Sequence, residues 1–165
     1  MEKATNTGLP RLLYGFKNMV RRLILSQTPR VPTKCTASAV CRRNNGVGLV
    51  FDYMSSESLK ILVWEDPTGS YEWYDPPSQL TLYELLDGDW TTVATASSDL
   101  DLSVDEDEWA TLKVQVDSGF VSGFFNGTEV LSGETTVVEG PGRVGVWTWD
   151  NDGGVCFGDV LVSLL

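Results

Sequence analysis

The feature that most constrains the fold is an alternation of apolar and polar residues that begins near residue 35 and runs to the end of the chain. In residues 109–117, for example, Leu112, Val114 and Val116 occupy every second position. Successive side chains of a β-strand point to opposite faces of the sheet, so this period of two predicts a strand with one buried face. Turn-forming residues interrupt the pattern about every ten residues, and no helical pattern follows residue 26. The sequence therefore predicts an all-β domain, folded as an antiparallel sandwich or barrel.

Three short segments predict tight turns between these strands. They are Asn44-Asn45-Gly46, Asp87-Gly88 and Asn126-Gly127, which combine residues that tolerate the left-handed backbone of β-hairpin turns. The predicted strands are residues 35–43, 46–54, 58–66, 70–75, 80–88, 89–96, 109–117, 119–127, 128–133, 143–150 and 154–165.

Several strands show which residues share a face. In residues 119–127 the same-face set is Val121, Gly123 and Phe125, as expected of a strand that buries one side. The strand at 58–66 divides into two opposed sets of side chains, and the strand at 143–150 has two tryptophans on one side. The opposed sets are Leu59, Ile61 and Val63 against Lys60, Leu62 and Trp64, and Val144, Val146 and Thr148 against Arg143, Gly145, Trp147 and Trp149.

Charge divides the chain into two segments. Of the net charge of −11, residues 1–34 contribute +6, from seven Lys/Arg and one acid, and residues 35–165 contribute −17. At 165 residues the chain has room for one core, which we place in 35–165. An acidic body repels phosphates, so nucleic-acid binding is not expected.

No apolar run reaches the roughly 18 residues of a membrane helix. The absence of His removes the commonest general base and zinc ligand.

The basic N-terminal segment has a different pattern. Residues 10–26 repeat apolar side chains at three- and four-residue steps, with Lys and Arg between them, which predicts an amphipathic helix. This segment is either an organellar transit-like sequence, a helix that packs on the sandwich or on a partner, or a start that differs from the natural one. Residues 28–32 contain two prolines and predict an extended linker.

The three cysteines, Cys35, Cys41 and Cys156, leave at least one outside any disulfide. Cys35 and Cys41 are about 20 Å apart along one straight strand, too far to bridge. A pair with Cys156 requires the first and last strands to be neighbours. The alternative is that all three are small buried hydrophobes.

The C-terminal half resembles laminin-G-like and concanavalin A-like domains. Residues 109–117, 119–127, 142–148 and 155–162 give, in order, a Trp-led strand, a strand ending in Asn-Gly, a Gly-x-x-Gly strand and a final strand with Phe157 and Asp159. Residues 48–73 are similar to part of the thrombospondin C-terminal lectin-like domain. The resemblance implies a jelly-roll β-sandwich over 35–165. Such domains usually open with a further strand or two before the first strand matched here, so either that edge strand is missing or the basic segment covers the edge.

Trp147 and Trp149 are the candidate ligand-binding residues. Indole faces stack on the apolar faces of sugar rings, and two indoles at alternate positions of a strand form a platform. Arg143 on the same face supplies hydrogen-bond donors, and the alternate pair Tyr71 and Trp73 extends the platform. The alternative is that these rings fill the second face of a two-layered fold or pack under a loop.

Calcium is the one cofactor that the sequence suggests. Residues 150–153 read Asp-Asn-Asp-Gly, with oxygen ligands at alternate positions followed by Gly, although a plain turn explains them equally well. The resemblance implies a calcium ion at the rim of the sandwich and adds Asp159, although Gly158 replaces an acidic neighbour common in relatives. The expected ligands are Asp150, Asp152 and Asp159.

Catalysis is not expected. Retaining jelly-roll hydrolases need two carboxylates about 5.5 Å apart, and the consecutive acids at 105–108 point to both faces. The sequence therefore favours a non-catalytic recognition module of laminin-G/lectin type, which binds carbohydrate or an extracellular protein and functions in adhesion. The alternative is an accessory subunit of a larger assembly, docked through its basic helix. The resemblance implies an extracellular or cell-surface location, and the transit-like start suggests an organelle instead.

Overall fold

The computed structural model describes residues 26–27, 33–41, 45–66, 78–104, 109–139, 142–149 and 155–164. Within these ranges the chain forms eleven β-strands and no helix, as the alternating pattern predicts. The strands are β1 (Ser26–Gln27), β2 (Thr33–Cys41), β3 (Asn45–Ser55), β4 (Ser58–Asp66), β5 (Gln79–Leu86), β6 (Asp89–Thr95), β7 (Ala110–Asp117), β8 (Phe120–Phe125), β9 (Thr128–Glu134), β10 (Arg143–Trp149) and β11 (Val155–Leu164).

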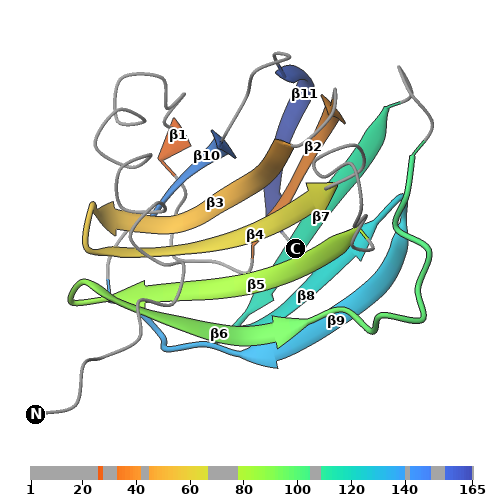
Figure 1. The fold of residues 1–165 in the computed structure, drawn as a ribbon. Coiled ribbons are helices and arrows are strands. Elements are labelled where there is room, and N and C mark those ends of the chain that lie inside the picture. The colour runs from red at the N-terminus through yellow and green to blue at the C-terminus, as the bar shows by residue number, and fades with distance from the viewer. Residues whose placement is uncertain are drawn as a thin grey trace, which may run out of the picture.

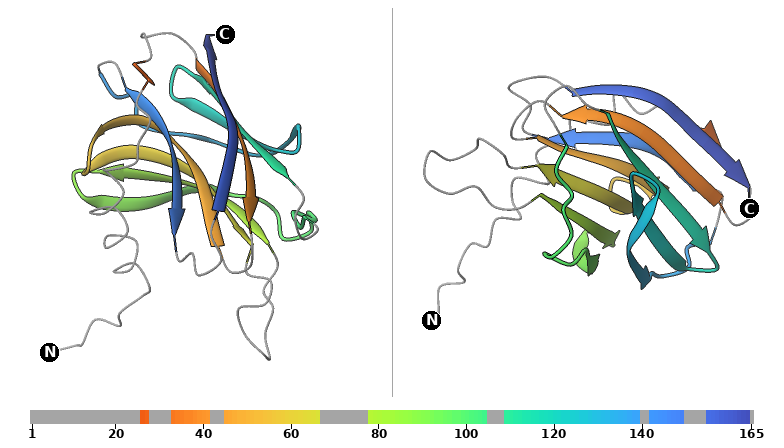
Figure 2. Two further views of the ribbon diagram at one scale, coloured as in Figure 1. Left: turned by 90° about the horizontal axis from the view of Figure 1, so that it is seen from above. Right: turned by 90° about the vertical axis from the view of Figure 1, so that its right-hand side faces the viewer.

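The strands form two antiparallel sheets stacked as a sandwich (Figures 1 and 2). Sheet A has the order β1-β10-β3-β4-β5-β6, and sheet B has the order β11-β2-β7-β8-β9. In Figure 1 sheet A lies toward the viewer, with β7, β8 and β9 behind it. The prediction of a jelly-roll sandwich is therefore confirmed, and a closed barrel is ruled out because each sheet has two edges.

Two of the predicted turns join neighbouring strands. Asp87 and Gly88 have φ angles of 51° and 87°, and Asn126 and Gly127 have φ angles of 47° and 86°. Two successive positive φ values define the type I′ turn, whose twist matches that of the flanking strands. These turns close the β5–β6 and β8–β9 hairpins, so both predictions are confirmed. The sequence reading missed a third such turn, at Ser118 and Gly119, which closes the β7–β8 hairpin.

The predicted hairpin turn at residues 44–46 is wrong. Strand β2 pairs with β11 and β7 in sheet B, whereas β3 pairs with β10 and β4 in sheet A. The connection from β2 to β3 therefore crosses from one layer to the other. Asn and Gly permit any sharp reversal of the chain, so their presence does not specify which strands become neighbours.

The main core lies between the two sheets. The predicted inward residues Leu112, Val114 and Val116 of β7 all belong to it or pack against it, as do Val121 and Phe125 of β8. Sheet A contributes Val47, Leu49, Phe51, Leu62, Trp64, Leu80 and Leu82 to this core. Trp64 is central among them: its ring lies 5.2 Å from that of Phe125, and its Nε1 donates a hydrogen bond to the carbonyl oxygen of Leu102 at 3.1 Å.

Charged groups close one end of this core. Lys60 is fully buried on the inner side of β4, and its Nζ lies 2.8 Å from a carboxylate oxygen of Asp52. Glu84, the register partner of Lys60, accepts hydrogen bonds from the backbone N–H and hydroxyl of Thr136 at 2.8 and 3.2 Å. Burial of a charge is tolerated only with such partners, so this cluster fixes the end of the sandwich without requiring a ligand.

A short strand precedes the region where the resemblance begins. Ser26 and Gln27 form β1 and pair with Val144 and Arg143 at the edge of sheet A. The predicted helix at residues 10–26 lies outside the described residues except for Ser26, which belongs to this strand. No helix in the described part of the chain is long and apolar enough to cross a membrane.

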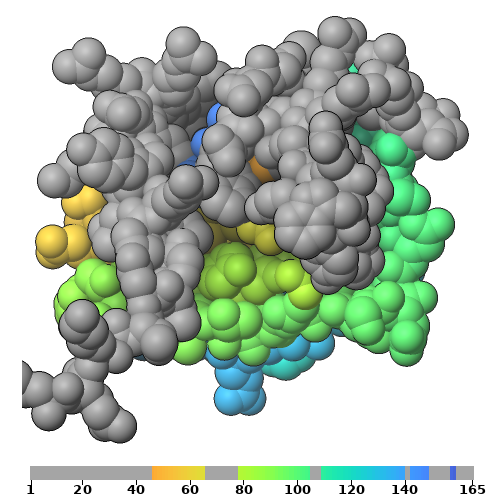
Figure 3. Space-filling model, viewed as in Figure 1, coloured from red at the N-terminus to blue at the C-terminus, as the bar shows by residue number. Residues whose placement is uncertain are grey.

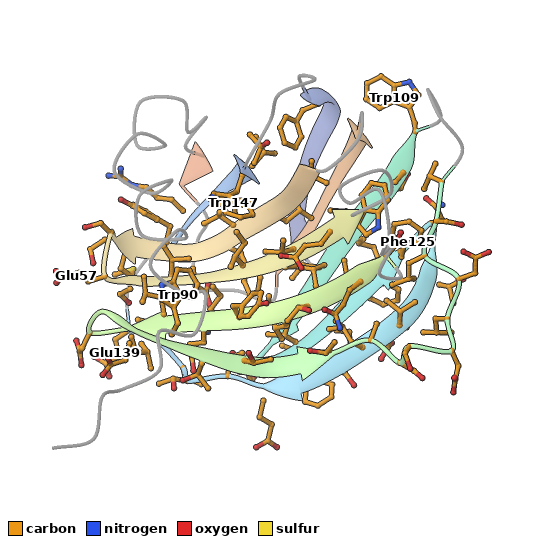
Figure 4. The ribbon with its side chains drawn as sticks, in the orientation of Figure 1. Glu57, Trp90, Trp109, Phe125, Glu139 and Trp147 are labelled. Carbon is orange, nitrogen blue, oxygen red and sulfur yellow. The ribbon has the colours of Figure 1, made fainter. Side chains whose placement is uncertain are left out.

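The position of Trp64 generates the first prediction. Trp64 is 1% exposed, whereas Trp109, immediately before β7, is 52% exposed. Trp109 is labelled in Figure 4. We expect Trp64→Ala to lower the free energy of unfolding by about 3–5 kcal/mol, because it leaves a large cavity. The control Trp109→Ala should change it by less than about 0.5 kcal/mol. Urea denaturation of both variants measures the difference, and equal losses would contradict this assignment of the core.

Candidate ligand-binding face

Sheet A has a second apolar face, which points away from sheet B. Along β4, Leu62 and Trp64 belong to the core between the sheets, and the residues that alternate with them point the opposite way. Leu59, Ile61 and Val63 are nonetheless only 0–1% exposed. The predicted division of β4 into two opposed sets of side chains is therefore confirmed, and β4 is buried on both faces.

Three neighbouring strands extend this surface, which we call the outer face of sheet A. Trp147 of β10 is 1% exposed, and Val50 of β3 and Leu85 of β5 join it in one cluster with the outward residues of β4. Three half-buried aromatic residues pack against the cluster: Tyr53, Tyr83 and Trp90. The rings of Tyr83 and Trp90 meet edge to face, with centroids 6.2 Å apart. Trp147 and Trp90, both labelled in Figure 4, thus belong to a single face.

Polar groups lie near one end of this face. Thr81 is buried, and Tyr83 and Glu65 are half-buried on the same side of β5 and β4. Burial raises the pKa of the Glu65 carboxyl. Burial also raises the pKa of Tyr83, and the negative charge of Glu65 adds to that effect, while a hydrogen bond with Thr81 opposes it. A carboxylate and a phenol that interact at the border of an apolar surface can direct hydrogen bonds at a bound molecule.

The space-filling view looks onto this side of the molecule (Figure 3). Atoms of β5 and β6 are visible along the lower part of the view, and a band of β4 and β5 atoms is visible above them. In this view, the visible described part of the outer face is therefore the part near β5.

The predicted site residues differ in burial, and three of their side chains are outside the described residues. Trp147 belongs to the outer face of sheet A but is buried, which agrees with the alternative that its ring fills the second face of the sheet. Arg143 is exposed at the start of the same strand, and its Cα pairs with that of Tyr53. The side chain of Trp149 is outside the described residues, and so are Tyr71 and Trp73 entirely.

Sequence reasoning missed Tyr83, Trp90 and Glu65 as members of the face. A signal for them was present in β4, whose residues are apolar on both sides. A strand of that kind requires cover on both faces, and its neighbours β3 and β5 share the same requirement. Following that requirement from β4 to β5 leads to Tyr83, which is the register partner of Ile61.

The described residues do not test the expected calcium ligands. Asp150 and Asp152 lie outside the described residues, and only the backbone of Asp159, in β11, is described. Among the described residues no group of three or more Asp, Glu, Cys or His could hold a metal ion.

Strands β2 and β11 are neighbours, but no two of the three cysteines are register partners: Cys35, Cys41 and Cys156 oppose Val162, Val155 and Val40.

Calcium binding by residues 150–159 stays a prediction with a direct test. Because a ligand that binds only the folded state stabilises it, Ca²⁺ should raise the melting temperature of the full chain, and chelator should reverse the rise. Asp150→Asn combined with Asp152→Asn should abolish the effect. A melting temperature that is indifferent to both Ca²⁺ and chelator contradicts the prediction.

The raised pKa of Glu65 generates a prediction about stability and pH. Between the ordinary value of 4.5 and the raised value, the folded state binds more protons than the unfolded state, so stability falls as pH rises through that window. The carboxylate therefore destabilises the fold at pH 7. Glu65→Gln should raise the melting temperature at pH 7, and the gain should vanish below pH 4.5. If Glu65→Gln changes the melting temperature no more than the exposed control Glu134→Gln does at both pH values, burial does not raise the pKa of Glu65.

Sequence comparison gives no relative: no protein-family model and no curated protein matches the chain. Solved structures do match. Carbohydrate-binding module CBM66 from Bacillus subtilis aligns with a TM-score of 0.61 at 13% identity, over 85% of this chain and 80% of the other. Sheep galectin-11, in complex with glycerol, aligns with a TM-score of 0.62 at 12% identity, over 86% and 96%.

A third match comes from a larger protein. The GH43 protein BlXynB from Bacillus licheniformis, as a mutant, aligns with a TM-score of 0.58 at 10% identity, over 87% of this chain but only 30% of the other. All three share the concanavalin A-like jelly roll. At these identities the likeness shows the fold of the chain, which is the one implied by the resemblance of residues 109–162.

Proposed function

We propose that this chain is a non-catalytic carbohydrate-recognition module and that its ligand site is the outer face of sheet A. The observation that carries the proposal is the second apolar face, with four aromatic residues on it. A two-layered sandwich needs one apolar face on each sheet, and the other face of each normally meets water. An additional apolar face marks a surface that packs against another segment or binds a ligand.

The residues of this face suit sugars. Aromatic rings such as Trp90 and Tyr83 offer flat surfaces for the apolar side of a pyranose ring. Glu65 accepts hydrogen bonds from sugar hydroxyls, and the hydroxyl of Tyr83 donates or accepts. The charge of −17 over residues 35–165 repels anionic ligands, so neutral glycans are the favoured class.

The comparisons support the carbohydrate class. Two of the matched structures carry names of carbohydrate-binding proteins, a carbohydrate-binding module and a galectin, and the chain covers most of each. The match to the GH43 protein covers only a fraction of that protein. Among the described outward residues of β3, β4 and β5, Glu65 is the single carboxylate, and a retaining or inverting hydrolase requires two. We therefore propose binding without hydrolysis.

The alternative of an accessory subunit also has an observation in its favour. Trp147 is internal, as expected if the tryptophans serve packing and not an open sugar platform. In this alternative the chain docks on its assembly through the basic helix at residues 10–26. A laminin-G-type role on the cell surface would instead make a protein the ligand.

A binding assay separates these functions. We expect the full chain to retain neutral oligosaccharides on a glycan array or in affinity electrophoresis. Glu65→Gln should weaken binding about tenfold and Tyr83→Phe by a few-fold, as hydrogen bonds to a charged and a neutral group predict. Ser122→Ala, on β8 of sheet B, is the matched control and should bind normally. Absence of glycan binding, or binding that survives both substitutions, contradicts the proposal.

A further inference from the structure

Strand β3 contains an extra residue at Asp52. Between two of its register pairs with β10, β3 has two residues, Phe51 and Asp52, where β10 has only Val144. The register between β3 and β4 is also interrupted after Phe51. Two residues opposite one define a β-bulge, which shifts the alternation of side chains by one position. The residue after Asp52 therefore points to the face opposite to the one that a regular strand would give it.

The bulge brings Tyr53 to the outer face of sheet A. Phe51 belongs to the core between the sheets, and in a regular strand Tyr53, two positions later, would point the same way. Tyr53 instead packs against the apolar cluster of the outer face, to which Val50 of the same strand also belongs. Without the bulge, the outer face would lose one of its aromatic residues.

The backbone at Asp52 has a conformation that is unusual inside a strand. Its φ is 49°, whereas the other described non-glycine residues with positive φ lie in the turns of hairpins. The left-handed region is unfavourable for a residue with a Cβ, so it persists only where surrounding contacts impose it. The contacts of Asp52 must therefore account for the bulge.

Two contacts hold Asp52 in this conformation. Lys60 Nζ lies 2.8 Å from its carboxylate, and the Lys60 side chain is only 1% exposed. Gly142 packs so closely on the same residue that a Cβ at position 142 would lie 2.7 Å from the Asp52 Cα. A buried ion pair adds little net stability over well-packed apolar residues, so stability alone does not account for a lysine at position 60.

We propose that the Lys60–Asp52 ion pair holds the bulge of β3 and thereby keeps Tyr53 on the outer face of sheet A, where its ring contacts the glycan. The contact with the glycan rests on the proposed function, whereas the placement of Tyr53 does not. Lys60 and Asp52 are positioning residues in this proposal, because the buried Lys60 lies on the core side of sheet A and acts on a ligand only through Tyr53.

The place of Tyr53 indicates the size of the ligand. Tyr53 lies in the part of β3 opposite Leu59, which pairs with Leu85 of β5. Leu85 in turn pairs with Trp90 of β6. Strands β3 and β6 are separated by three strand spacings, about 14 Å. A ligand that contacts both Tyr53 and Trp90 is therefore longer than one sugar ring, which makes a neutral oligosaccharide the expected ligand.

The first measurement needs no sugar and follows nuclear Overhauser contacts between the Tyr53 ring and methyl groups of the outer cluster. We expect Lys60→Met to weaken these contacts by roughly half or more, because Asp52 is then free to leave its strained conformation. Adding Asp52→Gly to Lys60→Met should restore them, since glycine adopts a positive φ at little cost. The control Val121→Ala, which removes core volume in sheet B, should leave them unchanged.

Two results overturn the proposal. Unchanged Tyr53 contacts in Lys60→Met show that the ion pair does not hold the bulge. Failure of Asp52→Gly to restore the contacts shows that Lys60 acts through the stability of the sandwich and not through the backbone of Asp52. If Lys60→Met alone does not fold, Lys60→Met combined with Asp52→Ala replaces it, and native contacts of Tyr53 in that variant contradict the proposal equally.

Glycan binding is measured separately, with a neutral trisaccharide. Tyr53→Ala and Lys60→Met should each weaken binding about fivefold, the size expected for one aromatic contact, and Lys60→Met with Asp52→Gly should bind as the unmodified chain does. Native affinity in Tyr53→Ala refutes the contact of its ring with the glycan. Absence of glycan binding by the unmodified chain contradicts only the proposed function, because the contacts of Tyr53 within the sandwich are tested without sugar.

Discussion

The arrangement of this protein depends on the burial of strand β4 on both of its faces. One face of β4 carries Leu62 and Trp64 into the core between the sheets, and the other carries Ile61 and Val63 into a second apolar cluster. A sheet in a two-layered fold has one neighbour, so the second cluster needs cover that sheet B cannot provide. Trp147 is buried in that second cluster, and the half-buried Tyr53, Tyr83 and Trp90 pack against it.

The architecture was predictable because the alternation of apolar and polar residues identifies the strands and their buried faces. The period of two in β7 and β8 correctly assigns Leu112, Val114, Val121 and Phe125 to the core, since a shift of one residue would expose all of them. The order of strands was less predictable. Residues 44–46 predict a hairpin, but they lie where the chain passes from sheet B to sheet A, because turn residues describe local geometry and not pairing partners.

The candidate site was predictable only in part. The sequence singles out Trp147 correctly as a residue on the side of β10 opposite Val146, but the alternation of one strand cannot show whether that side meets water. Burial there depends on segments distant in sequence. The roles of Tyr83 and Glu65 could not be read from β5 or β4 alone, because they arise from the register that places both strands on one face.

The two parts of the chain differ in charge and in pattern. The sandwich is acidic and has an apolar and aromatic cluster bordered by a carboxylate, whereas the sequence before β1 is basic and repeats apolar residues at helical spacing.

The most direct test of the central claim is chemical-shift mapping with a bound neutral oligosaccharide. On titration, the account predicts shifts of the indole N–H signals of Trp90 and Trp147 and of the amides of β4 and β5. The amides of β7, β8 and β9 in sheet B should remain in place. Shifts confined to sheet B, with the two indole signals unmoved, would contradict the assignment of the outer face of sheet A as the ligand site.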